Sequence, residues 1–526
     1  MTVSRTGPGP EGRPTASSAV PVGRSDSAGS GAGSGAAQQE VAQKEGGQPE
    51  LEQDGLHKGL GQRQLQMIAI GSAIGTGLFL GTGSRLQTAG PFLAVLYLVC
   101  GFFGYLILRC LGELIVHRPS YGSFVSYCRE FYGEPAAYVS GWLYWFNWAM
   151  TAVADATAIA IYLRWFSQYV AWIGAIPQWL TAMVVLALVL SINLISVKWF
   201  GEFEFWFSAI KVGALLLFLV VGIWFVVFGS PNGQPTGFNL ITGNGGILPK
   251  GIIPALVVTQ GVVFAYSGIE LVGTTSGETK DARTVIPKAI NLVMLRILIF
   301  YFGSVLLLCM LLPYTSYSGG ESPFVTFFSS IGVDIAAPIT QLVVITAAFS
   351  SLNAGLYSTG RIMYSLARAG SAPKFAGKLT KSGVPFGGIV MTGCVGVIGV
   401  FINMFVPKEA FEIVINLASI GVMGGWAAIT ISHLKFTKLA KQGKYERPEY
   451  AAPFAPFINY AILTFLATVV VLMAFDYPIG TSTLGVSLLF IPGLWIGWRA
   501  VRGRVNRIAA EREAREARLA ERRQRV

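Results

Sequence analysis

Apolar residues in the middle of the chain are grouped into about a dozen runs of roughly 18 to 30 residues with few charges, a length that crosses a bilayer as a helix. We predict twelve transmembrane helices, near residues 67–86, 92–115, 137–163, 179–197, 205–228, 252–275, 289–312, 336–366, 386–406, 412–433, 457–475 and 482–498. Helices and short loops fill this region, so no folded water-soluble domain fits between them. The pattern therefore predicts an all-α integral membrane protein.

The two ends of the chain have a different composition. Residues 1–54 are rich in Gly, Ser, Pro, Ala and Gln and carry too little apolar surface to offset the entropy of ordering, so we predict a disordered tail. This tail also lacks the apolar core and cleavage site of a secretory signal. Residues 499–526 contain ten Arg and four Glu among Ala residues, and we expect a basic tail that can form a surface helix on anionic lipid headgroups. The twelve-helix domain then occupies residues 55–498.

The composition agrees with a membrane protein. Of 526 residues, 53% are hydrophobic and 13% are charged, against roughly 25% charged in a typical soluble domain. The formal net charge of +12 divides into −3 on the first tail, +9 on the membrane region and +6 on the last tail, which argues against a nucleic-acid partner. The five cysteines show no CxxC spacing and do not cluster with the three histidines, so we expect no metal site, no disulfide framework and no cofactor.

The loops between the predicted helices differ in charge. If the first tail is cytoplasmic, fifteen Lys and Arg lie in the short loops on that side, whereas the other side carries four, Arg85, Arg164, Lys250 and Lys408. Cytoplasmic loops of membrane proteins carry such an excess of basic residues. An even number of helices also returns the basic C-terminal tail to the cytoplasm. We expect a multi-pass protein of the cell inner membrane with both termini in the cytoplasm.

Two of the predicted helices contain residues that weaken a helix. The first has three glycines between Gly71 and Gly77, and each weakens a helix by about 1 kcal/mol relative to alanine. The sixth combines small polar residues, a glycine and a carboxylate between Phe264 and Glu270. We therefore predict interrupted helices at these two positions. The alternative is that the glycines are close-packing positions for neighbouring helices.

Such interruptions predict a binding site, because unwound backbone is tolerated inside a membrane only where protein or a water-filled cavity satisfies its peptide groups. A half-helix beginning at Gly75 would direct N–H groups and a positive dipole end at an anion, and the carbonyl end of the other half-helix would favour a cation. An α-amino acid zwitterion carries both charges. Interruptions in the first and sixth helices also have the offset expected of two five-helix halves repeated with inverted topology.

Three charged residues, Asp155, Lys211 and Glu270, are predicted inside the membrane, where a charge costs at least ~2.5 kcal/mol unless it is paired or hydrated. Lys211 is a candidate for proton coupling, because a desolvated lysine is pushed toward its neutral form. The alternative is that Lys211 snorkels to the cytoplasmic interface. Glu270 could bind a substrate amine, take part in proton movement, or hold the two halves of its helix together. Asp155 could contact a polar substrate side chain or serve as a buried contact between helices.

Three segments, Gly71–Gly77, Ser267–Glu278 and Ser350–Gly370, resemble the bacterial amino acid permeases of the amino acid-polyamine-organocation (APC) superfamily. The likeness extends from near Gly59 to Trp498. Within that family, the segments most similar to the L-asparagine permeases are His117–Tyr127, Asn147–Thr151 and Phe475–Pro478.

The resemblance implies a leucine-transporter-like core of two inverted five-helix repeats plus two further helices, which imports an amino acid with protons by alternating access. It implies that Thr76 and Gly77 bind the substrate carboxylate and that carbonyl groups around Ser72, Ala73, Phe264 and Ala265 bind its ammonium group. Lys211 stands where relatives have a lysine in place of a sodium ion, which favours proton coupling.

The candidate residues form three sets. The substrate-binding set is Ser72, Ala73, Ile74, Gly75, Thr76, Gly77, Phe264, Ala265, Tyr266 and Gly268. Lys211 and Glu270 are the proton-coupling candidates. The candidates for side-chain selectivity are Thr151, Asp155, Ser351 and Asn353.

The expected function is import of a small neutral polar amino acid with a proton, with L-asparagine favoured and membrane lipids as the surroundings. Many relatives carry Glu where this chain has Asp155, and Asp there also resembles the permeases for D-serine, alanine and glycine, which are the alternative. A channel would need a continuous polar or carbonyl-lined pore. A membrane enzyme is disfavoured because no HExxH, GxSxG or phosphate-cradling sequence lies on a suitable element. A sensor remains an alternative, although neither tail resembles an output domain.

Overall fold

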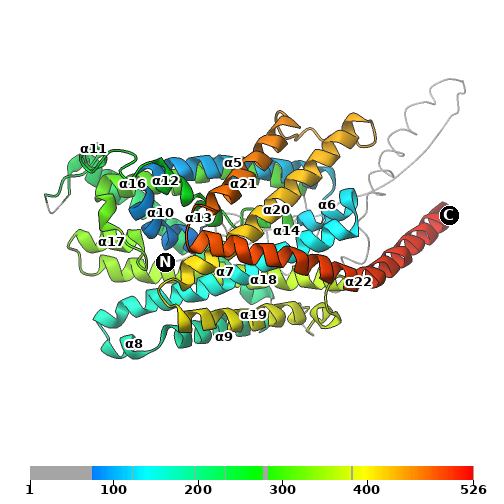
Figure 1. Ribbon diagram of the computed structural model, residues 1–526, viewed down its shortest axis with the longest axis horizontal. Helices are drawn as coiled ribbons and strands as arrows, with labels where there is room; N and C mark the ends of the chain where they lie inside the picture. The colour runs from blue at the N-terminus through cyan, green and yellow to red at the C-terminus, as the bar shows by residue number, and fades with distance from the viewer. Residues whose placement is uncertain are drawn as a thin grey trace, which may run out of the picture. The chain divides into compact units, whose positions relative to one another are not determined.

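The computed structural model describes residues 74–120, 123–195, 197–230, 233–275, 282–380 and 383–524. In these ranges every regular element is helical and none is a strand, which confirms the predicted all-α class (Figure 1). The predicted N-terminal tail, the start of the first predicted helix, and the candidates Ser72 and Ala73 lie outside the described residues.

Nine helical segments in the described part of the chain are long and apolar enough to cross a membrane. They are Phe92–His117, Ser123–Gln168, Gln178–Ile195, Gly201–Phe228, Arg283–Leu311, Ala336–Arg368, Phe386–Phe405, Ala410–Lys441 and Ile479–Arg515. Each coincides with one of the predicted helices. Two shorter apolar segments, Ile252–Ala265 and Phe457–Met473, coincide with the sixth and eleventh.

The long helices in Figure 1 are named by their labels from here on. They are α5 (Phe92–His117), α7 (Glu134–Trp165), α9 (Gln178–Ile195), α10 (Val197–Phe228), α18 (Ala336–Arg368), α19 (Phe386–Phe405), α20 (Ala410–Lys441), α21 (Phe457–Met473) and α22 (Ile479–Gln524). One further segment is built from α15 (Ala282–Arg296), the π-helical η4 (Ile297–Gly303) and α16 (Ser304–Leu311). Short helices include α6 (Ser123–Tyr132) and α8 (Ala171–Ala175).

Three predicted boundaries differ from the helix ends in the structure by two turns or more, and one of them is the end of the tenth helix, which was expected at residue 433 and lies at Lys441. The fifth helix was expected from residue 205 but begins at Val197, so that two acidic residues lie within it. The twelfth membrane helix was expected to end at residue 498, with a possible surface helix after it, and the structure has one continuous helix that ends at Gln524. Glu and Arg four residues apart, such as Glu511 and Arg515, stabilise a solvent-exposed helix, which accounts for the extension.

The interior of the bundle is organised around α7, which packs against α6, α9, α18, α19 and α20. Small residues bring these helices close together. A Cβ atom added to Gly421 of α20 would lie 2.6 Å from the Cβ atom of Asn147, and one added to Gly399 of α19 would lie 2.4 Å from a methyl group of Val153. Small residues at helix contacts let backbones approach closely in a membrane, where packing rather than water exclusion drives association.

The two ends of the bundle can be told apart by their short helices. Because α7 begins beside α6 and ends beside α8, we call these the α6 end and the α8 end (Figure 1). The last part of α22 is fastened at the α6 end. Arg504 donates hydrogen bonds to the carbonyl oxygens of Gly370 (2.7 Å) and Ala372 (3.0 Å), which follow α18. Arg512 forms an ion pair of 2.7 Å with Glu134 at the start of α7.

Candidate functional site

The first interrupted segment is described from Ile74 onward. Gly75 is extended (φ −136°, ψ −158°), and the short helix α3 (Thr76–Phe79) begins directly after it. The carbonyl oxygen of Gly75 accepts hydrogen bonds from the amides of Leu78 and Phe79, both at 3.2 Å. The helix α4 (Gly81–Ala89) continues the segment toward the α8 end. The first amides of a helix have no partner within the helix, so the start of α3 offers N–H donors to an anion.

The second interrupted segment lies between two short helices. The helix α13 (Thr259–Ala265) ends at Ala265, residues 266–270 form turns, and α14 (Leu271–Thr275) begins at Leu271. Gly268 has φ +99°, a left-handed conformation that glycine adopts without steric cost. Both carboxylate oxygens of Glu270 accept a hydrogen bond from the Gly268 amide at 3.3 Å, and one also accepts from the indole N–H of Trp426 at 3.4 Å. This arrangement favours the role of Glu270 in holding the turn.

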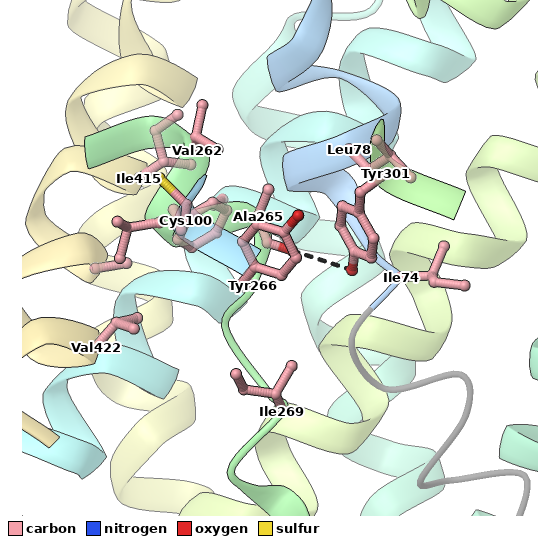
Figure 2. Close-up of a cluster of buried hydrophobic side chains, with 14 of the residues drawn as sticks. Ile74, Leu78, Cys100, Val262, Ala265, Tyr266, Ile269, Tyr301, Ile415 and Val422 are labelled. Atoms are coloured by element: carbon pink, nitrogen blue, oxygen red, sulfur yellow. Dashed lines mark hydrogen bonds between the residues drawn. The ribbon is translucent and has the colours of Figure 1, made fainter. Parts of the chain in front are cut away.

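Two tyrosines, Tyr266 of the turn and Tyr301 of η4, connect this part of the chain to its neighbours (Figure 2). The hydroxyl of Tyr266 donates to the carbonyl oxygen of Tyr97 on α5 at 2.7 Å, and the hydroxyl of Tyr301 donates to that of Ala265 at 3.3 Å. The rings of Tyr266 and Tyr301 stack with centroids 4.4 Å apart. The carbonyl group of Ala265, one of those expected to bind an ammonium group, therefore already has one donor.

The two interrupted segments touch backbone to backbone. A Cβ atom added to Gly77 of α3 would lie only 2.6 Å from the Cα atom of Ala265 at the end of α13. Figure 2 shows Ile74 and Leu78 of the first segment in one cluster of buried hydrophobic side chains with Tyr266 and Ile269 of the second. The N–H end of one short helix and the carbonyl end of another thus lie side by side, with no room for a side chain at Gly77.

A buried carboxylate lies next to the first interruption. Asp155 of α7 is fully buried and accepts a hydrogen bond of 2.7 Å from the hydroxyl of Thr76. Within the described part of the chain its second oxygen, Oδ2, has no hydrogen-bond partner. Ser351 of α18 lies at the same place, since its hydroxyl oxygen is 3.2 Å from where a Cβ atom on Gly75 would be. The structure therefore brings Thr76, Asp155 and Ser351 together.

Asn147 contacts the second interrupted segment, although none of the three candidate sets includes it. Its side-chain amide lies 3.5 Å from the hydroxyl of Ser267, in the second interrupted segment, and it is fully buried. The signal available in the sequence was a polar amide side chain within the predicted membrane helix 137–163. Thr151, one turn further along α7, uses its hydroxyl to donate to the carbonyl oxygen of Asn147 at 2.9 Å.

Lys211 lies inside the bundle and is not exposed at its surface. It is fully buried, and its ammonium group donates a hydrogen bond of 2.8 Å to the hydroxyl of Ser350 on α18. Ser350 in turn donates to Oε1 of Glu204 at 2.8 Å, and Ser208 lies 3.3 Å from the same oxygen. Glu204 is a fully buried charge that the sequence reading missed, because its helix was expected to begin one residue later.

Asn353, the remaining selectivity candidate, is hydrogen-bonded to α9. Its side-chain oxygen accepts a bond of 2.8 Å from Asn193 of α9. Among the described residues no group of three or more His, Cys, Asp and Glu could hold a metal ion.

Known proteins resemble this chain over most of its length. The sequence profile of the amino acid permeases matches residues 64–502. L-asparagine permease 1 of Mycobacterium tuberculosis (strain CDC 1551 / Oshkosh) is 55% identical over 462 residues, which cover 88% of this chain and 94% of the relative. The L-asparagine permease of Escherichia coli (strain K12) is 54% identical over 457 residues, with 87% and 91% covered. That of Streptomyces coelicolor (strain ATCC BAA-471 / A3(2) / M145) is 50% identical over 458 residues, with 87% and 93% covered.

These matches confirm the predicted family. Together with the long apolar helices, they make the chain a multi-pass membrane transporter of amino acids and not an enzyme. The interrupted segments, Asp155 and Lys211 all fall within the matched residues. The chain belongs to the amino acid permease family of the APC superfamily.

Proposed function

We propose that this permease imports a small neutral polar amino acid together with a proton, by alternating access, and that L-asparagine is its preferred substrate. The observation that carries the proposal is the contact of the two interrupted segments at Gly77 and Ala265, beside the buried carboxylate of Asp155. The relatives named L-asparagine permease support the choice of substrate.

In this proposal the substrate lies across both interruptions. Its carboxylate binds the N–H groups from Gly75 to Gly77, and its ammonium group binds carbonyl groups at the end of α13. The unpartnered oxygen of Asp155 accepts a hydrogen bond from the side-chain carboxamide. That contact selects asparagine over alanine and glycine, which have no side-chain donor and would leave the carboxylate unsatisfied.

The proposed architecture has twelve membrane helices, arranged as two inverted five-helix repeats and two additional helices. The α6 end faces the cytoplasm, because the loops at this end carry most of the Lys and Arg residues. Both termini then lie in the cytoplasm and the protein in the cell inner membrane.

A polar network at the α8 end supports alternating access. Arg85 of α4 forms an ion pair of 3.5 Å with Glu412 of α20. Gln260 of α13 donates hydrogen bonds to Asn416 of α20 at 2.9 Å and to Asp476 at 3.2 Å, and burial raises the pKa of the Asp476 carboxyl group. These contacts join the helices that follow the first interruption and precede the second. These helices have to separate for the site to open at the α8 end. The closed and the open arrangement are the two states whose equilibrium a substrate can shift.

The test is uptake of labelled L-asparagine into proteoliposomes that contain the purified protein. We expect saturable uptake, accumulation when the proton gradient is directed inward, and recovery of chemically unchanged asparagine. Uptake that ignores an imposed proton gradient would contradict the coupling. Uptake without saturation would favour a channel.

A competition panel of L- and D-amino acids tests the substrate. We expect unlabelled L-asparagine to compete more strongly than D-serine, alanine or glycine. Stronger competition by D-serine or glycine would favour the second candidate, a permease for D-serine, alanine and glycine, which the chain resembles in having an aspartate at position 155.

A further inference from the structure

Lys211, Ser350 and Glu204 form a linear chain of hydrogen bonds inside the bundle. Lys211 donates to Ser350 at 2.8 Å and Ser350 donates to Glu204 at 2.8 Å, so every donor points toward the carboxylate. All three residues are fully buried. This is the arrangement in which a hydroxyl can receive a proton from one neighbour while passing its own to the next.

The chain also has a direction across the membrane. Glu204 precedes Lys211 by seven residues on α10, which places it about 10 Å nearer the start of that helix. The start of α10 follows α9 at the α6 end, which is the cytoplasmic end in the proposed orientation. Ser350, which accepts the hydrogen bond from Lys211, is followed in the sequence by Ser351, whose hydroxyl lies at the first interruption. The chain therefore leads from the substrate site toward the cytoplasm.

The burial of Lys211 and Glu204 favours transfer of a proton between them. An ammonium group and a carboxylate out of water each lose several kcal/mol of hydration, and their attraction offsets this only in good geometry. Moving one proton from Lys211 to Glu204 converts both groups to their neutral forms.

We propose that Glu204 is the proton acceptor of Lys211 and passes the coupled proton on toward the cytoplasmic end. This inference rests on the proposed proton symport. In the step, an N–H bond of the Lys211 ammonium breaks as an O–H bond forms on Ser350, and the original O–H bond of Ser350 breaks as one forms on Oε1 of Glu204. An amine and a carboxylic acid result, with the serine unchanged. Water entering from the α6 end then takes the proton from Glu204 and leaves its carboxylate ready for the next cycle.

The rival reading is that the three residues only fasten α10 to α18. The variant Glu204→Gln distinguishes the proton relay from this structural role. Its amide has nearly the same shape and can still accept a hydrogen bond from Ser350, but it does not take up a proton. Glu204→Asp keeps the chemistry with a shorter side chain. The matched control is Glu202→Gln on the same helix, because Glu202 is partly exposed and two residues turn a helix by about 200°.

The experiment compares two measurements in proteoliposomes for each variant. Counterflow exchange of labelled L-asparagine at equal pH reports binding and alternation, and accumulation under an imposed pH gradient reports coupling. A positioned side chain speeds proton transfer by about a hundredfold or more, so we expect Glu204→Gln to lower gradient-driven accumulation at least about tenfold while counterflow stays within about twofold. We expect Ser350→Ala to act in the same direction, Glu204→Asp to restore part of the accumulation, and Glu202→Gln to match the natural protein.

Three other outcomes would overturn the relay, and one of them would also overturn the proposed coupling. Accumulation by Glu204→Gln equal to that of the natural protein would overturn the relay and leave the proposed function standing. Parallel loss of counterflow and accumulation, with no recovery in Glu204→Asp, would assign Glu204 to packing and overturn it as well. A natural protein that exchanges asparagine but ignores the gradient would overturn the proposed coupling itself, and the relay with it.

Discussion

Two glycines allow close approach at the contact between the interrupted segments because they have no side chain. Gly77 has no side chain, and this allows the start of α3 to meet the end of α13. Gly75 allows the hydroxyl of Ser351 to approach the same backbone from α18. In most helices a glycine lowers stability. At this contact, glycine allows the peptide groups of two segments to come within reach of one small ligand.

We expect Gly77→Ala to abolish uptake, because its Cβ atom would lie 2.6 Å from a backbone atom of Ala265 and the two segments would have to separate. The matched control is Gly213→Ala on α10, where a Cβ atom meets nothing within 4 Å and alanine favours the helix by up to about 1 kcal/mol. Initial rates of asparagine uptake, normalised to the amount of folded protein, measure the effect. Comparable rates for the two variants would contradict the close contact.

Among the connecting elements, the loop between α20 and α21 is fastened by a buried carboxylate. Glu113 of α5 is fully buried and contacts His433 of α20 at 2.9 Å. It also accepts hydrogen bonds from Arg447 at 2.6 Å and 3.1 Å and from the backbone amide of Ala452. Asn459 of α21 completes the cluster with a bond of 2.9 Å to His433. Three helices and their loop are thus held at one point at the α6 end.

We expect removal of the charge from this cluster to lower the thermal stability of the protein and to leave its substrate specificity unchanged. Glu113→Gln removes the charge from the buried contact with His433, and a hydrogen bond to a charged group contributes about 1.5–3 kcal/mol. Solvent screens the pair with Arg447, whose side chain is 34% exposed, so this pair adds less. We expect a clearly lower melting temperature in detergent, whereas Glu449→Gln, an exposed residue of the same loop, should change it little. An unchanged melting temperature for Glu113→Gln would show that the loop is held by other contacts.

For the whole molecule, the sequence predicts the membrane helices well and the contacts between them poorly. The length of an apolar run is constrained by the bilayer, so the nine long segments lie where the runs predict. Contacts between distant segments, such as Thr76 with Asp155, depend on helix packing that no local pattern encodes. Glu204 was missed because charged residues mark a helix end in a hydropathy profile, although packing against α18 lets this helix continue past the charge.

The orientation of the whole molecule can be tested with two surface cysteines. Lys408 lies near the α8 end and Lys444 near the α6 end, and both are exposed. In a Cys394→Ala background, where the remaining four cysteines are buried, we expect a membrane-impermeant maleimide on intact cells to label Lys408→Cys and not Lys444→Cys. Permeabilised cells should show label on both. The reverse pattern on intact cells would invert the proposed orientation.

The unbroken course of α22 has a practical consequence for structure determination. This helix runs from Ile479 to Gln524 and is anchored near its end through Arg504 and Arg512. A compact protein fused in helical register after Gln524 would therefore keep a fixed angle to α7 and α18. Such a fusion would serve as an alignment marker for single-particle electron cryomicroscopy, in which the detergent belt otherwise hides most features of a bundle of this size.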